Sequence, residues 1–309
     1  MATMAKVALV IIYNHQYNQN IDKLEYIYKG RFSNIYHLVP FYAGEKNNVI
    51  SVYANSEQFQ GYIAQGFKTF FSADYAHYFF VADDLFLNPG INENNYRQYF
   101  KLNGGTSFLP GFISLHEVTD HWVGLTRAYY YNLEVTGIEA KDQMPPYHEA
   151  LEKFTRHGLN IEPLSFDNIW DKPEKKPSPL FNFINTIYYN ARRFKSKLAR
   201  KKYSLTYPMV GSYADISVVS ADAIQQFAHY CGVTAATGLF VEVGLPTALV
   251  LAAKEIVTET QLKLKGKTLW SPQDFAAMER YENVLANLIK DFPEETLYIH
   301  PVKLSKWIS

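Results

Sequence analysis

The chain has 309 residues, 48% of them hydrophobic and 19% charged, which is typical of a folded globular protein and not of a disordered one. Its 30 basic and 30 acidic residues cancel, so the net charge gives no reason to expect nucleic acid as a partner. Cys231 is the only cysteine, which excludes an intrachain disulfide and a cysteine-based zinc site.

The first ninety residues predict an alternation of strands and helices. Residues 6–13 predict a first strand buried on both faces, because the run is continuously apolar from Val7 onward. Further strands are expected at 35–42, 49–54 and 77–82, and helices at 21–28 and 57–71. Strands that alternate with helices indicate an α/β fold with a mostly parallel sheet flanked by helices.

The order of elements beyond residue 90 is less regular. We expect a helix over 92–102, a strand pair or bent strand over 108–118, a strand at 215–219, a helix at 221–230 closed by Gly232, and a final helix at 272–290. Neither the apolar run at 7–13 nor the one at 239–253 is long enough for a transmembrane span. The sequence shows no signal peptide. We therefore expect a cytoplasmic protein, with a peripheral place on the inner face of a membrane left open.

A long amphipathic helix is predicted at about 180–202, after a proline-rich loop at 172–179. Its second half carries seven basic residues within eleven positions: Arg192, Arg193, Lys195, Lys197, Arg200, Lys201 and Lys202. Such a helix can lie on an anionic membrane surface. It can equally pack on the main domain and leave its basic face in solvent, and the sequence does not decide between the two.

Two adjacent carboxylates, Asp83 and Asp84, follow the apolar strand at 77–82. Ligands of α/β sheets bind at the carboxyl ends of strands, and carboxylates suit Mg²⁺ or Mn²⁺ that carries a diphosphate. The pair therefore predicts a metal site. The alternative is an ordinary strand end with solvated acids.

His300 is the candidate for a third metal ligand. It follows a short apolar segment at 297–299, and Lys303 and Lys306 come soon after it. An imidazole accepts Mn²⁺, and a nearby lysine would neutralise charge on a departing diphosphate. The alternative is a surface histidine in a C-terminal tail.

Glu242 is the first candidate for a catalytic base and Asp215 the second. Each lies in an apolar stretch, where a lone carboxylate is costly unless it is paired or functional. Partial burial would raise the pKa of such a group and fit it to take a proton from a hydroxyl. A structural ion pair between Glu242 and an arginine is the alternative.

Ala82-Asp83-Asp84, about 80 residues from the N-terminus, resembles the Asp-x-Asp motif of GT-A-fold glycosyltransferases, with Ala82 in the first acidic position. The C-terminal tail is similar to that of glycogenin-like galactosyltransferases. His300 and Lys306 keep the family's six-residue spacing and Trp307 follows directly, but Lys303 takes the place of a glycine and a proline is missing.

This resemblance implies a single GT-A-like domain over 1–309, with a nucleotide-binding half at 1–90 and an acceptor-side half, rich in helices, at 91–309. It implies a glycosyltransferase of the bacterial surface-polysaccharide type, a hexosyltransferase and more narrowly a galactosyltransferase, that uses a UDP-sugar and a glycan or lipid-linked glycan acceptor. Mn²⁺ or Mg²⁺ would be held by Asp83, Asp84 and His300, and the diphosphate by Lys303 or Lys306. Tyr13 would stack on the base, Asn14 would contact the nucleoside, and Asp83 would reach the ribose or the metal.

Other classes are less well supported. No Gly-x-Gly-x-x-Gly follows the first strand, and the chain has neither a Gly-x-x-x-x-Gly-Lys phosphate loop nor a Gly-x-Ser-x-Gly elbow. A nucleotidyltransferase would need a glycine-rich N-terminal loop, which is missing. A non-catalytic nucleotide- or membrane-binding module stays open as the alternative to an enzyme.

Overall fold

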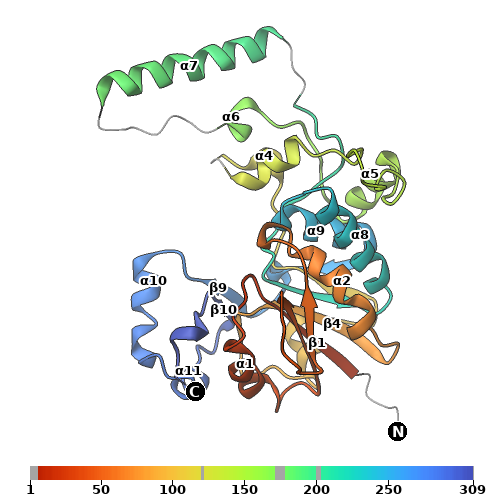
Figure 1. Ribbon diagram of the computed structural model, residues 1–309, viewed down its shortest axis with the longest axis vertical. Coiled ribbons are helices and arrows are strands. Elements are labelled where there is room, and N and C mark those ends of the chain that lie inside the picture. Colours follow the sequence, from red (N-terminus) through yellow and green to blue (C-terminus); the bar gives the residue numbers. More distant parts are fainter. Residues whose placement is uncertain (1–5, 120–121, 171–177, 200–202, 309) are drawn as a thin grey trace.

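The computed structural model describes residues 6–119, 122–170, 178–199 and 203–308, and its centre is a seven-stranded sheet (Figure 1). The strands are β1 (Lys6–Ile12), β2 (Asn34–Pro40), β3 (Val49–Val52), β4 (Tyr75–Ala82), β6 (Thr106–Phe108), β7 (Ile216–Ser220) and β8 (Glu255–Val257). Their order is β3-β2-β1-β4-β7-β6-β8. Only β7 runs antiparallel to its neighbours. The predicted α/β fold with a mostly parallel sheet is confirmed.

The two faces of the sheet belong to two separate cores. Alternate residues of β1 show this: Ala8 and Val10 lie in one core, and Val7 and Leu9 lie in the other. The first core is covered by α2 (Gln60–Phe70), α8 (Ile224–Ala236) and α9 (Val241–Ala252), and the second by α1 (Asn20–Tyr28), α3 (Tyr96–Phe100) and α11 (Leu285–Lys290). Burial on both faces explains the unbroken apolar run at the start of the chain.

Three sequence predictions about individual elements are wrong. The segment 108–118 is neither a strand pair nor a bent strand: Pro110 and Gly111 follow β6, and the chain then makes a single antiparallel bridge from Ile113 to Gly211 and a 3₁₀ turn. Gly232 lies inside α8, and it is Gly238, with φ +79°, that follows the helix. The expected helix at 272–290 is split into α10 (Pro272–Ala276) and α11, with two residues of positive φ between them.

Between the sheet strands β6 and β7, the described part of the chain forms four helices: α4 (Val123–Tyr129), α5 (Tyr147–Arg156), α6 (Phe166–Ile169) and α7 (Pro179–Leu198). Short 3₁₀ turns occupy Ser56–Gln58, Leu115–Glu117, Glu259–Gln261, Glu279–Tyr281 and Leu304–Lys306. Among the described residues, none of the helices has the combination of length and apolar composition that a membrane crossing requires.

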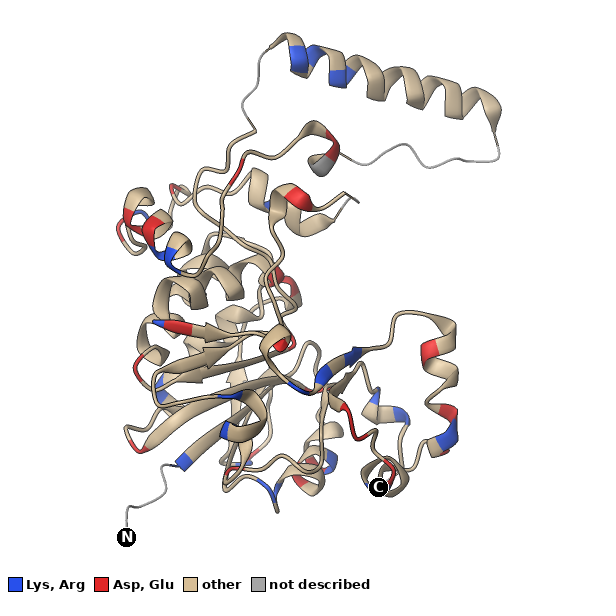
Figure 2. Ribbon diagram, turned by 180° about the vertical axis from the view of Figure 1, so that it is seen from behind, with Lys and Arg blue, Asp and Glu red and all other residues tan. Residues whose placement is uncertain are grey.

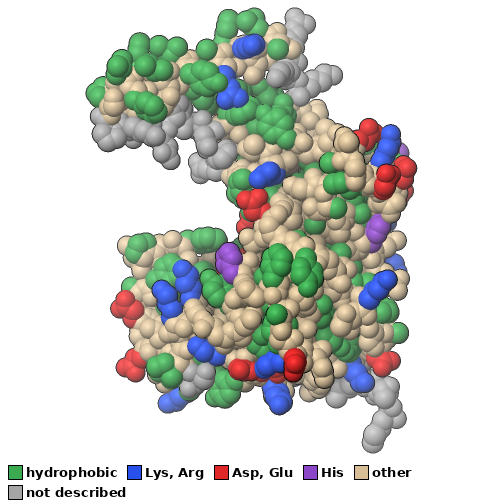
Figure 3. Space-filling view, viewed as in Figure 1, with side chains coloured by type: hydrophobic (Ala, Val, Ile, Leu, Met, Phe, Trp, Pro, Cys, Tyr) green, Lys and Arg blue, Asp and Glu red, His purple; other side chains and the backbone are tan. Residues whose placement is uncertain are grey.

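The predicted long helix is α7, which stands away from the body of the molecule beyond α6 (Figure 1). Its basic residues are confined to the part of the helix near one end, and it contains no acidic residue (Figure 2). Hydrophobic side chains gather over it in the space-filling view (Figure 3). The proline-rich loop at 172–177 and the last three predicted basic residues, at 200–202, lie outside the described residues.

A second, small sheet joins the C-terminal part of the chain to the end of β4. It consists of β5 (Phe86–Leu87), β10 (Thr296–His300) and β9 (Lys265–Thr268), in the order β5-β10-β9. Because β5 begins directly after the Asp83-Asp84 turn, this sheet determines which distant residues reach the acidic pair.

Candidate functional site

Asp84 and His300 are brought together by strand pairing across 216 residues of sequence. β10 runs antiparallel to β5 with Ile299 opposite Phe86, and the backbone N–H of Val302 donates to the carbonyl of Asp84 over 2.6 Å. This register places Nε2 of His300 2.9 Å from Oδ1 of Asp84. The structure therefore places two of the three predicted metal ligands, Asp84 and His300, in direct contact.

Asp215 completes a group around the same imidazole. It immediately precedes β7, the neighbour of β4, and its carbonyl accepts a hydrogen bond from the N–H of Ala82 over 2.9 Å. Oδ1 of Asp215 lies 3.6 Å from Nε2 of His300. On the other side of the ring, the Tyr213 hydroxyl is hydrogen-bonded to Nδ1. One imidazole thus has a phenol on one nitrogen and two carboxylates at the other.

The charges in this group affect one another. Burial of the His300 ring opposes its charged form, but the hydrogen bond to Asp84 and the charge of Asp215 outweigh burial and raise the pKa of His300. Burial likewise raises the pKa of Asp215, although the neighbouring imidazole acts to lower it. The group is a buried acid–base cluster, which is common at functional sites.

Asp83 points away from this cluster. Its side chain is only 3% exposed, and Oδ2 accepts a hydrogen bond from Nδ2 of Asn20, at the start of α1, over 3.0 Å. Burial, and then the charge of Asp84, raise the pKa of Asp83 to about 7. The two adjacent acids therefore have different environments: Asp84 faces His300, whereas Asp83 faces the first turn of α1.

The predicted metal ligands do not form a ready-made cage. Among the residues that the structure describes, no group of three or more His, Cys, Asp or Glu side chains is arranged to hold a metal ion. The chemistry of the donors still fits Mn²⁺ or Mg²⁺, because Asp84, Asp215 and His300 offer two carboxylates and an imidazole within one cluster.

A hollow of about 260 Å³ lies beside this cluster and contains three of the predicted site residues, Asn14, Asp215 and Glu242. Its other lining residues include His15, Ser56, Glu57 and Phe240. Oδ1 of Asn14 is buried and has no hydrogen-bond partner within the described part of the chain. A larger hollow of about 710 Å³ lies elsewhere, against α3 and α11, and includes none of the predicted site residues.

Glu242 lies in the first turn of α9 and is half-buried at the edge of this hollow. Oε2 accepts a hydrogen bond from the indole Nε1 of Trp122 over 2.9 Å, so among the described residues its partner is an indole and not an arginine. Burial and the charge of Asp215 raise the pKa of Glu242, and the bond from Trp122 opposes this rise. A carboxylate in this state can take up a proton more readily than one in water.

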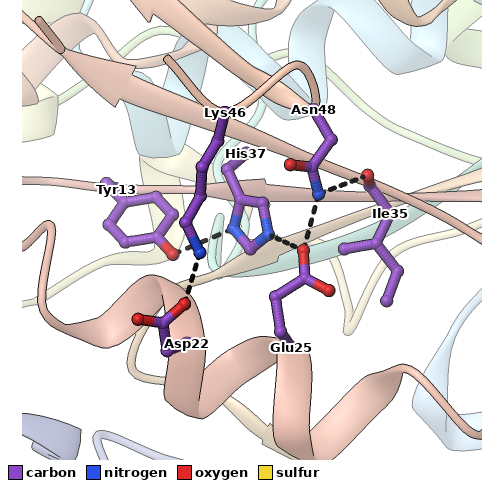
Figure 4. Close-up of polar contacts among 7 residues, drawn as sticks. All are labelled: Tyr13, Asp22, Glu25, Ile35, His37, Lys46 and Asn48. Atoms are coloured by element: carbon purple, nitrogen blue, oxygen red, sulfur yellow. Dashed lines mark hydrogen bonds and ion pairs between the residues drawn. The ribbon is translucent and has the colours of Figure 1, made fainter. Parts of the chain in front are cut away.

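Tyr13 is part of a buried polar network and not of the hollow (Figure 4). Its ring is fully buried and its hydroxyl lies 2.9 Å from Nδ1 of His37. Nε2 of His37 is 3.1 Å from a carboxylate oxygen of Glu25, on α1, and Asn48 donates to the same oxygen. The ring of Tyr13 therefore has no free face for a nucleobase in this structure.

The C-terminal tail is attached to α1. Nζ of Lys23 donates to the carbonyls of Leu304 and Trp307, over 2.7 and 2.5 Å, and the ring of Trp307 is buried. Lys303 and Lys306 are both exposed on this tail. Their ammonium groups are thus free to contact an anion, and the backbone that carries them is held in place by Lys23.

The sequence analysis missed three residues that contact the predicted ones: Asn20 beside Asp83, Trp122 beside Glu242, and Tyr213 beside His300. Tyr213 lies two positions before Asp215, and this closeness was the only available signal. Trp122 is 120 residues from Glu242, so no local pattern could have revealed it.

No protein-family model matches this chain, and a search of curated proteins finds no significant match. The function is therefore inferred from the geometry of the site and from the resemblance of the Asp83-Asp84 and C-terminal motifs to those of GT-A-fold glycosyltransferases.

Proposed function

We propose that the protein is a metal-dependent glycosyltransferase of GT-A type that moves a hexose from a UDP-sugar to a glycan or lipid-linked glycan acceptor. The observation that carries the proposal is the meeting of Asp84, at the end of the central strand β4, with His300 of the C-terminal tail. Asp84 and His300 belong to the two segments that carry the family-like motifs, and nothing in their sequence separation requires them to touch.

Asp84, His300 and Asp215 are the residues that would hold Mn²⁺ or Mg²⁺. The ion, when bound, supplies Lewis-acid stabilisation of the diphosphate leaving group. Asp215 is favoured over Asp83 as the third ligand, because its carboxylate faces the imidazole while that of Asp83 is bound by Asn20. Lys303 and Lys306 are the candidates to neutralise the remaining diphosphate charge.

Asn14 is the proposed contact for the nucleoside. Its unpartnered Oδ1 can accept a hydrogen bond from the N–H of a base such as uracil. Tyr13 then has a supporting role, because its network with His37 and Glu25 fixes the end of β1 from which Asn14 extends. Asp83 remains a candidate for the ribose hydroxyls.

Glu242 is the proposed base. It lines the same hollow as Asn14 and Asp215, so an acceptor hydroxyl in that hollow would lie within its reach. In an inverting enzyme Glu242 would accept the proton of that hydroxyl, and in a retaining enzyme it would orient the acceptor. Its raised pKa and its hydrogen bond from Trp122 fit either role.

The test is turnover of a panel of UDP-sugars in the presence of Mn²⁺, measured as release of UDP with and without glycan acceptors. We expect turnover of at least one donor, and a loss of at least about 100-fold in Asp84→Asn and Glu242→Gln. Asp74→Asn is the matched control, because Asp74 precedes the amino end of the same strand and is 74% exposed. Binding of UDP without turnover of any sugar would favour the non-catalytic nucleotide-binding module instead.

A further inference from the structure

The outermost helix of the molecule, α7, turns its polar side toward the protein and its apolar side toward solvent. None of its residues is buried. The half-covered residues are the polar Asn182, Asn185, Arg192, Arg193 and Ser196 and the aromatic Tyr189, whose hydroxyl is bound to Asp167. The large apolar and aromatic residues on the other side are exposed over 42–69% of their surface: Leu180, Phe181, Phe183, Ile184, Ile187, Tyr188, Phe194 and Leu198. This arrangement is the reverse of a helix packed on a core.

Specific contacts hold α7 in this orientation. The hydroxyl of Tyr189 donates to Oδ1 of Asp167, on α6, over 2.8 Å, and a guanidinium nitrogen of Arg193 lies 2.6 Å from Oδ2 of the same residue. The guanidinium of Arg192 stacks 3.8 Å above the centre of the Trp170 ring. Two of the predicted basic residues therefore attach the helix to the protein, and the expectation of a basic face left in solvent is wrong for them.

The charges of α7 indicate what covers its apolar side. The helix contains no acidic residue, and its two lysines, Lys195 and Lys197, are exposed. Long lysine side chains beside an apolar surface reach the headgroups of a lipid interface. A second copy of α7 in the same place would offer these lysines no acidic partner. An anionic surface with an apolar interior matches both properties.

We propose that α7 is a membrane-interface helix that inserts its apolar side into an anionic bilayer surface and holds the protein there. Helices of this kind combine a wide apolar face with basic residues and bind more tightly as the anionic lipid content rises. The contacts of α7 with Asp167 and Trp170 would keep the rest of the protein at the membrane when the helix binds there. The proposal does not depend on the glycosyltransferase assignment.

The test is co-flotation of the full chain with lipid vesicles. One set consists of phosphatidylcholine with about a third phosphatidylglycerol, and the other of phosphatidylcholine alone. We expect binding to the anionic vesicles, and about 25-fold weaker binding of the Lys195→Gln/Lys197→Gln variant, at about fivefold for each lysine near the surface. The variant Ile187→Asp/Phe194→Asp should lose more than about 25-fold in affinity, because it removes apolar contact with the lipid in addition to introducing two unfavourable charges.

Thr186→Asp is the matched control, since it adds an acidic residue to the same helix outside the set of large apolar residues. It should lose no more than about fivefold in vesicle affinity, which is what one unfavourable charge near the surface accounts for. Because no residue of α7 is buried, the thermal unfolding of all these variants should match that of the parent. Failure to bind anionic vesicles would overturn the proposal, as would equal losses in Thr186→Asp and Ile187→Asp/Phe194→Asp. A dimer in light scattering that only the apolar-side variant dissociates, without vesicle binding, would assign the surface to self-association.

Discussion

His77, in the middle of β4, should make the protein lose stability as the pH falls below about 6.5, the usual pKa of a histidine. Its ring is fully buried in the strand that ends at the acidic pair. Nε2 donates to the carbonyl of Thr106 over 3.1 Å, and Nδ1 lies 2.8 Å from the Tyr96 hydroxyl. That hydroxyl also accepts from Nε of Arg97 over 3.1 Å, so its own proton is directed at Nδ1. The network satisfies the neutral ring.

The size of the effect follows from the pKa. Burial lowers the pKa of His77 from 6.5 to about 4, with the charge of Arg97 acting in the same direction and the bond to Thr106 against it. The unfolded chain binds a proton between these two values and the folded chain does not, so stability falls as the pH decreases through that range. Between pH 7.5 and 4.5 the loss is about 2.5 kcal/mol.

The assay is urea unfolding at a series of pH values, for the parent and for His77→Gln. Glutamine keeps a donor for Thr106 and does not titrate. We expect the variant to be less stable than the parent at pH 7.5 by about 1–2 kcal/mol, from the lost contact with Tyr96. Its stability should then decline between pH 7.5 and 4.5 by about 2.5 kcal/mol less than that of the parent.

The control is His148→Gln on α5, whose side chain is 88% exposed, and its pH profile should coincide with that of the parent. The reasoning would be refuted if His77→Gln declined with pH as steeply as the parent does.

Two further experiments test the packing and the hydrogen bonding around the site. Gly266→Ala should lower the free energy of unfolding by about 1–3 kcal/mol, because the new Cβ would lie 2.1 Å from a ring carbon of Tyr298, on the same strand as His300. Gly104→Ala, where no atom lies within 4 Å, should stay within about 0.5 kcal/mol of the parent, and equal effects of the two in thermal unfolding would contradict this reasoning. A double-mutant cycle of Trp122→Phe and Glu242→Gln should give a coupling of about 1–2 kcal/mol by urea unfolding, whereas additive losses would show that their hydrogen bond contributes nothing.

The sheet could be predicted from the sequence because its central strands are buried on both faces and read as long apolar runs. Complete burial also makes some helices hard to predict, because a helix that is apolar on all sides shows no periodic pattern. The run that contains α9 is apolar on all sides, so it shows no helical period, and Gly244 and Pro246 within it gave no indication of a helix. The split between α10 and α11 depends on Glu282 and Asn283 at positive φ, which their residue types do not require.

The site was predictable only where a motif lies at a strand end. Asp84 follows β4 and His300 ends β10, and the pairing of β5 with β10 makes them neighbours. The orientation of side chains at those ends is a tertiary property. Asp83 faces Asn20 and Tyr13 faces His37, and neither direction is specified by an apolar pattern that continues on both faces of the sheet.

The most direct test of the central claim is thermal stabilisation by UDP, with and without Mn²⁺. A ligand that binds the native state at a hundred times its Kd adds about 2.7 kcal/mol of stability, which shifts the melting temperature by several degrees. The site described above predicts a shift that requires Mn²⁺, is lost in Asp84→Asn and persists in Asp74→Asn. A UDP shift that is independent of Mn²⁺ or retained in Asp84→Asn, or no shift at all, would contradict it.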